Sequence, residues 1–128
     1  MTGNDSVLVV APSEQEYRQI SDCLAAEGIE ARPAQCLLQA VLQQAVEPAS
    51  VVVYDTDSPE CWRDALRQFL RLRPGTRVVL LSRLADDQMW MDVLLHGGHD
   101  LLLKPYQQAE LLSAIGNAIR PHGKRMVA

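Results

Sequence analysis

Residues 51–55 read Val51-Val52-Val53-Tyr54-Asp55, an uninterrupted apolar run that ends on a carboxylate. The run is short and rich in β-branched residues, which predicts a strand buried on both faces, as in a parallel sheet covered by helices. Two further runs have the same form, because residues 78–82 end on a serine and residues 101–104 end on a lysine. The carboxyl ends of neighbouring parallel strands meet at one edge, where open α/β sheets place their working sites. The sequence therefore predicts a carboxylate, a hydroxyl and an ammonium at that edge.

Stretches with helical spacing of apolar residues separate these strands along the chain. Capping residues mark two of the helix starts, at Ser13 and at Ser58-Pro59. The second helix is predicted to begin at Pro33, with an apolar side formed by Leu37, Leu38, Val41 and Leu42. The predicted strands are residues 7–10, 29–32, 50–55, 77–82 and 100–103, and the predicted helices are residues 14–27, 33–47, 58–72, 86–96 and 106–119. Such βα units, joined by right-handed crossovers, predict a doubly wound parallel α/β sheet.

The chain has the size of one ordinary domain. It has 128 residues and a formal charge of −4, and we expect a single domain with its core at about residues 6–120. Residues 121–128 would form either a tail or the start of a linker. The negative charge is opposite to the basic stripe of phosphate-backbone binders, so no direct nucleic-acid binding is expected. No apolar run approaches about 20 residues and no signal-peptide pattern opens the chain, so we expect a cytoplasmic protein without a membrane segment.

Two common kinds of site are disfavoured by the motifs that are missing. The odd number of widely spaced cysteines predicts neither a disulfide framework nor a zinc site; they are Cys23, Cys36 and Cys61. The loop after the first predicted strand, Ala11-Pro12-Ser13-Glu14, contains no glycine. A Gly-rich turn at this place is what cradles a phosphate group, so a nucleotide binder or a small α/β enzyme is the disfavoured interpretation.

The residues that end the strands, taken together with residues 97–106, resemble a known family. Asp55 ends the third strand, Ser82 ends the fourth, and residues 97–106 read Gly97-Gly98-His99-Asp100-Leu101-Leu102-Leu103-Lys104-Pro105-Tyr106. This pattern resembles the CheY-like receiver domain of two-component response regulators over about residues 6–120. The resemblance implies a flavodoxin-like (βα)5 fold with strand order 2-1-3-4-5.

The resemblance also implies a role for each matched residue. Asp55 would accept a phosphoryl group from a histidine kinase, and the Ser82 hydroxyl would follow the phosphoryl oxygen. Lys104 would pair with Asp55 and then with the phosphoryl group, and a cis peptide bond would precede Pro105. Asp57 would offer its backbone carbonyl to Mg²⁺, whereas its side chain is interpreted as a solvated loop residue.

One departure from the family changes the expected activity. The family holds Mg²⁺ with an acidic pair after the first strand, where this chain has Ala11-Pro12-Ser13. Glu14 is the nearest acid, and we expect it in the first helical turn rather than at the site. Mg²⁺ favours carboxylate ligands, so we expect weak Mg²⁺ binding and weak or no phosphorylation of Asp55. This resembles an atypical receiver that acts by protein–protein interaction and is no enzyme beyond self-catalysed phosphoryl transfer. The alternative is a phosphorelay component that a histidine kinase modifies on Asp55.

The fourth predicted helix carries more apolar residues than one buried face needs. They spread over about two-thirds of its circumference and are Met89, Trp90, Met91, Val93, Leu94 and Leu95. We expect some of them, including Trp90, to be exposed or to cover another chain; packing into neighbouring helices is the alternative. In the resembled family, partners and dimers dock on the fourth helix, fifth strand and fifth helix. The resemblance thus implies a kinase, a downstream protein or a second copy as partner, with Leu101 at the usually aromatic switch position and Tyr106 beside it.

Overall fold

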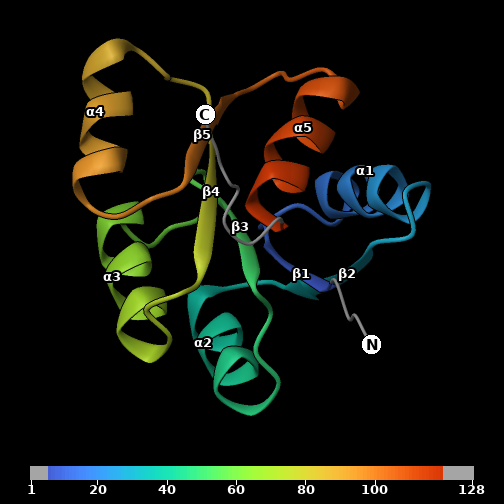
Figure 1. Cartoon of the computed structure of the whole chain (residues 1–128), viewed down its shortest axis with the longest axis horizontal. Coiled ribbons are helices and arrows are strands. Elements are labelled where there is room, and N and C mark those ends of the chain that lie inside the picture. Colours follow the sequence, from blue (N-terminus) through green and yellow to red (C-terminus); the bar gives the residue numbers. More distant parts are fainter. Residues whose placement is uncertain (1–5, 120–128) are drawn as a thin grey trace, which may run out of the picture.

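The computed structural model describes residues 6–119 as strands that alternate with helices (Figure 1). The strands are β1 (Ser6–Val10), β2 (Glu30–Ala34), β3 (Val51–Asp55), β4 (Arg77–Ser82) and β5 (Asp100–Leu103). The helices are α1 (Glu14–Ala25), α2 (Leu37–Val46), α3 (Trp62–Leu72), α4 (Asp87–Leu95) and α5 (Gln108–Ile119). The tail or linker expected at residues 121–128 lies outside the described residues. Within the described range, every helix is too short or too polar to cross a bilayer.

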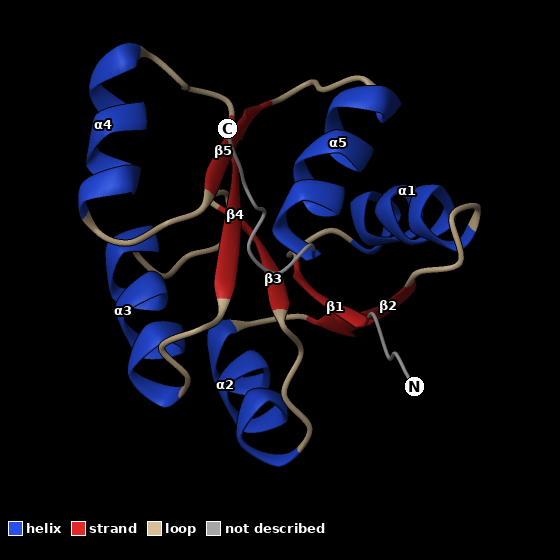
Figure 2. Ribbon diagram, viewed as in Figure 1, coloured by secondary structure: helices blue, strands red, loops and turns tan. Residues whose placement is uncertain are grey.

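The strands form one parallel sheet in the order β2-β1-β3-β4-β5, which confirms the predicted doubly wound fold. Helices α1 and α5 cover one face of the sheet, and α2, α3 and α4 cover the other (Figure 2). The chain reverses its direction of winding between β1 and β3, and such a switch point is where an α/β sheet opens a crevice at its carboxyl edge. Asp55 is the last residue of β3 and therefore lies beside this crevice.

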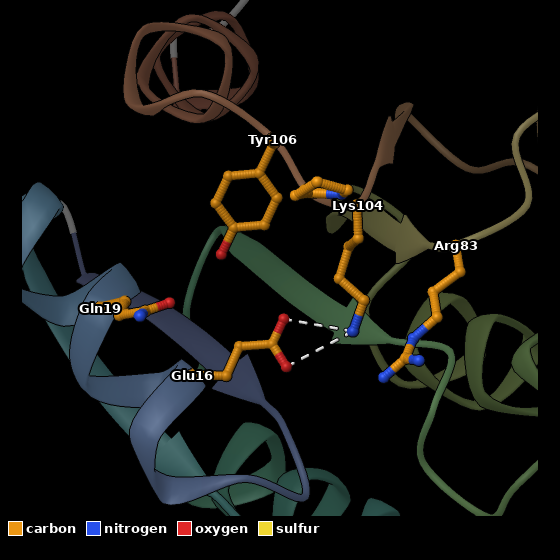
Figure 3. Close-up of a pocket in the computed structure, with 6 residues that line it drawn as sticks. Glu16, Gln19, Arg83, Lys104 and Tyr106 are labelled. Carbon is orange, nitrogen blue, oxygen red and sulfur yellow. Dashed lines mark hydrogen bonds and ion pairs between the residues drawn. The ribbon is translucent and has the colours of Figure 1, made fainter.

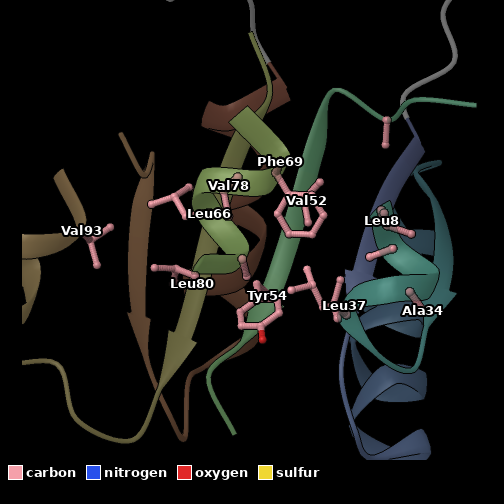
Figure 4. Packing of buried hydrophobic residues seen from close by; sticks show 14 residues of the cluster. Leu8, Ala34, Leu37, Val52, Tyr54, Leu66, Phe69, Val78, Leu80 and Val93 are labelled. Carbon is pink, nitrogen blue, oxygen red and sulfur yellow. The ribbon is translucent and has the colours of Figure 1, made fainter. Parts of the chain in front are cut away.

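Alternate residues of the central strands fill two separate hydrophobic layers. On the side of α2, α3 and α4, side chains of β1, β3 and β4 pack with Leu66 and Phe69 of α3 (Figure 4). Tyr54 lies in this layer with its ring edge-on to Phe69, at a centroid distance of 6.4 Å. On the other side, Val9 and Val53 belong to the layer that α1 and α5 cover. Burial of β3 on both faces holds Asp55 at a fixed place.

The structure corrects the prediction that Pro33 opens a helix. Pro33 lies inside β2 and is paired with Val9 of β1. β2 is the edge strand of the sheet, so only one side of it needs backbone donors and a proline is tolerated there. α2 begins only at Leu37, and the Gln39 side chain accepts a hydrogen bond from the Gln35 amide just before it.

The inward side of α2 also differs from the predicted one. Leu37 is buried as predicted and Val41 is partly buried, but Leu38 and Leu42 are 67% and 58% exposed. The buried positions of α2 are Leu37, Ala40 and Gln44. The small side chain of Ala40 lets the helix sit close to the sheet, and this rotates the two larger leucines outward.

The third helix starts later than Ser58-Pro59 predicts. Its first residue is Trp62, and Ser58 is a buried loop residue whose amide donates to the Asp55 carbonyl at 3.0 Å. The Tyr54 hydroxyl donates to the Glu60 carbonyl at 2.9 Å, which anchors the loop to β3. These contacts keep residues 56–61 out of the helix and at the carboxyl edge of the sheet. α5 likewise begins at Gln108 instead of Tyr106.

Other predicted boundaries agree with the structure. Ser13 caps α1 by accepting a hydrogen bond from the Glu16 amide at 3.2 Å, and Asp86 caps α4 by accepting one from the Met89 amide at 2.8 Å. Gly28, which follows α1, has φ of 75°, a conformation that favours glycine. The bounds of β4 and β5 match the predicted ranges.

Gly98, just before β5, has no room for a side chain. A Cβ atom there would lie 2.5 Å from Val93 Cγ1 and 3.1 Å from the Val93 carbonyl oxygen. We expect Gly98→Ala to lower the free energy of unfolding by about 1–3 kcal/mol, because Val93 is fully buried and has no space to yield. Gly116→Ala in α5, where a Cβ meets nothing within 4 Å, is the control and should stabilise by about 0.5–1 kcal/mol. Urea unfolding measures both, and equal midpoints for the two variants would contradict this account.

Candidate functional site

The centre of the site is an ion pair between the ends of β3 and β5. Lys104 Nζ donates to both carboxylate oxygens of Asp55 at 2.9 Å. The Asp55 side chain is fully buried, and the Lys104 side chain is 10% exposed. Asp55 Oδ1 also accepts a hydrogen bond from the Asp57 amide at 2.8 Å. The structure therefore brings together the carboxylate and the ammonium that the sequence placed at this edge.

Two more carboxylates bind the same ammonium. Lys104 Nζ lies 3.2 Å from Glu16 Oε2 and 2.9 Å from Asp57 Oδ2 (Figure 3 shows the Glu16 pair). Arg83, from the loop after β4, binds the Asp57 carboxylate at 3.1 Å. The Asp57 side chain is 36% exposed, which agrees with the interpretation as a solvated loop residue, and two cations also bind it. Side chains with three negative and two positive charges meet here.

Sequence reasoning missed Glu16, although a signal for it exists. Glu16, Ile20 and Leu24 recur every four residues on α1, and the latter two are fully buried against the sheet. Residues at this spacing share one helix face, so the face that covers the sheet begins with Glu16, beside the carboxyl edge. Glu14 behaves as expected, because it is exposed in the first turn and pairs with Arg18 at 3.2 Å.

The charges of the site shift one another's titration. Burial, followed by the neighbouring Asp55 carboxylate, raises the pKa of Glu16 above its ordinary value of 4.5. The hydrogen bond from Lys104 lowers the pKa of Asp57 below 3.8. Burial alone would lower the pKa of Lys104, but the hydrogen bonds to Asp55 and Asp57 outweigh it and raise that pKa. Lys104 is therefore a permanent cation for which the carboxylates compete.

The Ser82 hydroxyl is hydrogen-bonded to the loop that follows β4. It donates to the Leu84 carbonyl at 2.7 Å and accepts from the Leu84 amide at 3.0 Å, closing a short turn after β4. The backbone of Ser82 still belongs to the site, because its carbonyl accepts a hydrogen bond from the Lys104 amide at 2.8 Å. The sequence placed Ser82 at the right edge, but its side chain serves the loop that leads into α4.

A cavity of about 380 Å³ opens beside the ion cluster. It is lined by Glu16, Gln19, Arg83, Lys104, Pro105 and Tyr106. The Lys104–Pro105 peptide bond is cis, as the resemblance implied. Burial raises the pKa of the Tyr106 hydroxyl to about 12, so the tyrosine is a neutral part of the wall.

The donor set fits a hard metal ion in chemistry but only partly in arrangement. Carboxylate oxygens from Glu16, Asp55 and Asp57 are the ligands that Mg²⁺ prefers. Their common point is taken by Lys104 Nζ. Across residues 6–119, no group of at least three acidic, histidine or cysteine side chains has metal-holding geometry. The loop after β1 adds no acid, since it consists of Ala11-Pro12-Ser13. Ala11 is buried, and its amide donates to the Ala34 carbonyl at 3.2 Å.

The outer side of α4 exposes the apolar residues that the sequence singled out. Val93 is buried and Met89 packs against the core, whereas Trp90 is 38% exposed and Leu95 is 75% exposed. We call the whole patch the α4–β5 surface; it consists of Leu84, Trp90, Met91, Leu94, Leu95 and Leu103. Leu101 is partly buried in the core layer beneath α4. The predicted exposure of Trp90 is therefore correct.

Replacing Lys104 by methionine tests the ion cluster. We expect Lys104→Met to lower the free energy of unfolding by about 3 kcal/mol near neutral pH, because Asp55 stays buried without its cation. The loss should shrink at lower pH. The pKa of Glu16 is already raised in the folded state, so at mildly acidic pH the folded variant binds more protons than the unfolded chain does. The free energy of unfolding of the variant therefore falls as the pH rises.

The measurement is urea unfolding at about pH 5 and about pH 7. Arg18→Met is the control, because it removes an exposed cation from the pair with Glu14 and should cost less than about 1 kcal/mol. If Lys104→Met lowers the free energy of unfolding no more than the control does, or equally at both pH values, the stabilising role of Lys104 in the ion cluster is contradicted.

Comparison with known proteins gives two kinds of similarity. No protein-family model matches the chain. The chemotaxis protein CheY of Listeria monocytogenes is 27% identical over 84 residues, which are 65% of this chain and 71% of that protein. The CheY protein of Listeria innocua matches to the same extent.

Solved structures give the fold over nearly the whole chain. A response regulator from Thermotoga maritima has a TM-score of 0.84 at 23% identity, covering 91% of this chain and 98% of that one. The chemotaxis response regulator CheY4 of Vibrio cholerae has a TM-score of 0.82 at 18% identity, with coverages of 91% and 99%. A beryllofluoride-activated NtrC4 receiver domain dimer has a TM-score of 0.84 at 22% identity, with coverages of 90% and 96%. The chain therefore has the fold of CheY-like response-regulator receiver domains, and its sequence similarity to CheY supports the same family.

Proposed function

We propose that this chain is a cytoplasmic receiver module that transmits signals by binding another protein, with weak or no phosphorylation of Asp55. The observation that carries the proposal is the occupation of Lys104 by three carboxylates, those of Glu16, Asp55 and Asp57. A phosphoryl group on Asp55 would need this ammonium for its own oxygens. Lys104 would then have to release at least one carboxylate, which costs free energy at a site with little contact to solvent.

Mg²⁺ would meet the same competition. The ion would supply charge neutralisation for the transferred phosphoryl group, and Asp55, Glu16 and the Asp57 backbone carbonyl are the groups that would hold it. Ala11-Pro12-Ser13 stands after β1 in place of an acidic pair. Glu16 is then the one α1 carboxylate at the cluster, and Lys104 already binds it. We propose that Mg²⁺ binds weakly for this reason and that the chain is an atypical receiver.

A second candidate function is favoured by the position of Glu16. Its carboxylate comes from α1, on the side of the site where the resembled family carries its acids, and it could replace them in part. In this alternative an Asp55 oxygen attacks the phosphorus of a phosphohistidine on a kinase. The new O–P bond forms as the P–N bond breaks, and the electron pair stays on the imidazole nitrogen, which takes up a proton. Lys104 would then balance the charge of the acyl phosphate.

Mass spectrometry after incubation with acetyl phosphate and Mg²⁺ separates the two candidates. We expect little or no mass increase on Asp55, and no difference between the chain and its Asp55→Asn control. Glu16→Gln should leave this result unchanged, and a beryllofluoride titration should not saturate. Introducing acids by Ala11→Asp with Pro12→Asp should raise Mg²⁺-dependent modification, because the missing metal ligands are then supplied. Stoichiometric, Mg²⁺-dependent modification of Asp55 in the unaltered chain would overturn the proposal.

The proposed partner surface is the α4–β5 surface with the adjoining face of α5. Asp92 turns toward α3, where Arg63 binds it at 2.8 Å, and Trp90 lies on the opposite flank of α4. β5 is an edge strand of the sheet that residues 6–119 form. We propose that a histidine kinase, a downstream signalling protein or a second copy of the chain binds here, and that neither nucleic acid nor a membrane is the direct partner at this surface.

A charged residue at the centre of this surface should abolish association. Trp90→Glu should keep the chain folded, at some cost in the free energy of unfolding because the indole is only 38% exposed, while self-association or partner affinity is lost. Sedimentation velocity and titration with the cognate kinase measure this. Gln15→Glu, at an exposed position of α1 on the other face of the sheet, adds the same charge and should change neither. Unchanged association of Trp90→Glu would remove the α4–β5 surface from the proposal.

A further inference from the structure

A second exposed apolar surface lies on α2, remote in sequence from α4. Leu38, Leu42 and Val46 recur every four residues and are 67%, 58% and 85% exposed. Residues at this spacing form one row along a helix. None of these residues belongs to the α4–β5 surface or to the ion cluster, so the row is a separate feature of the molecule. A row of large apolar side chains in water is unfavourable unless something covers it.

The polar residues of α2 bring no charge to this row. The helix carries no charged side chain, and its polar residues are three glutamines. Gln39 accepts from the Gln35 amide, Gln43 donates to the Pro33 carbonyl at 2.8 Å, and Gln44 is buried against Ala49. Each glutamine is thus engaged with nearby backbone, and the exposed side of α2 carries the apolar row with no charge beside it on the same helix.

The apolar row continues into a groove between α2 and α3. The two helices lie side by side on one face of the sheet (Figure 1). The groove has a volume of about 640 Å³; its lining residues are Val41, Asp64, Arg67, Gln68, Arg71 and Leu72. Val41 is three residues after Leu38 and one before Leu42, so it lies between the outward row and the groove and the two border one another.

The far wall of the groove is positively charged. Arg67 and Arg71 are one helical turn apart on α3 and both are exposed. Arg67 pairs with Asp64 of its own helix at 3.2 Å. Within residues 6–119, no carboxylate lies within ion-pair distance of Arg71. A chain with a formal charge of −4 thus presents an apolar strip beside unneutralised arginine charge.

We propose that the surface of α2 and α3 binds an amphipathic, acidic helix of a partner protein. We name it the α2–α3 surface; it comprises Leu38, Val41, Leu42, Val46, Arg67, Arg71 and Leu72. The apolar face of such a helix would cover the leucines, and glutamates or aspartates on its flank would pair with the arginines, often by two hydrogen bonds each. An amphipathic helix whose apolar face covers an apolar surface is a recurring form of peptide recognition.

The charge pattern favours this partner over a second copy of the chain. A two-fold axis places the same residues of both copies in one interface, and the one carboxylate of the groove, Asp64, already pairs with Arg67. A second copy would therefore bring no free carboxylate from this groove for Arg71. This inference is independent of the proposed function, because none of its residues belongs to the ion cluster or to the α4–β5 surface.

The test uses two synthetic peptides of about 18 residues, long enough to follow α2 and α3 as a helix. Both carry leucines at helical spacing; one has glutamates on the flanking positions and the other has lysines. Fluorescence anisotropy of the labelled peptides with the whole chain gives their affinities. We expect the glutamate peptide to bind at least about tenfold more tightly than the lysine peptide. Arg67→Glu combined with Arg71→Glu should reverse this preference.

The apolar row has its own control. Leu42→Ser should weaken binding of the glutamate peptide about tenfold, whereas Leu95→Ser, at an exposed leucine of α4, should not. Equal affinities of the two peptides, or equal effects of the two serine variants, would overturn the proposal. Binding to phosphatidylglycerol vesicles without peptide binding would also overturn it, in favour of a membrane. Self-association that Leu42→Ser abolishes would overturn it in favour of a second copy.

Discussion

A carboxylate with no exposure to water is tolerated in this molecule because one ammonium reaches it. Asp55 is held at the end of a strand that is buried on both faces, so it has no way to turn toward solvent. Lys104 crosses from the end of β5 to bind it, and in doing so meets Glu16 from α1 and Asp57 from the loop after β3. Strands and helices far apart in sequence are therefore joined at a single nitrogen atom. Loss of that atom would leave like charges facing one another in a place of low dielectric constant.

The fold was largely predictable because the sheet dominates the pattern of hydrophobic residues. Continuous runs such as residues 51–55 are unambiguous when both faces are buried, and the bounds of β4 and β5 followed directly. Prediction failed where long-range packing overrides a local signal. Pro33 looks like a helix start, but an edge strand also accepts proline. Ser58-Pro59 has the form of a cap, yet the tyrosine beneath it holds the loop in another shape.

The site was only partly predictable, for a different reason. Strand ends can be located from sequence, and this located Asp55, Ser82 and Lys104. Side-chain direction is set by the nearest partner, and that partner is invisible in sequence. Glu16 reads as one more acid in the first turn of a helix until Ile20 and Leu24 are known to face the sheet. Ser82 lies at the predicted edge of the sheet, but its hydroxyl binds the backbone of Leu84.

The turn closed by Ser82 links the ion cluster to the exterior of the protein. Its hydroxyl donates to the Leu84 carbonyl and accepts from the Leu84 amide, so the serine holds the start of the loop that leads into α4. Leu84 is 63% exposed and belongs to the α4–β5 surface. The position of this exposed leucine therefore depends on two hydrogen bonds from a side chain at the edge of the site, and removal of the hydroxyl would leave both of its backbone groups without that partner.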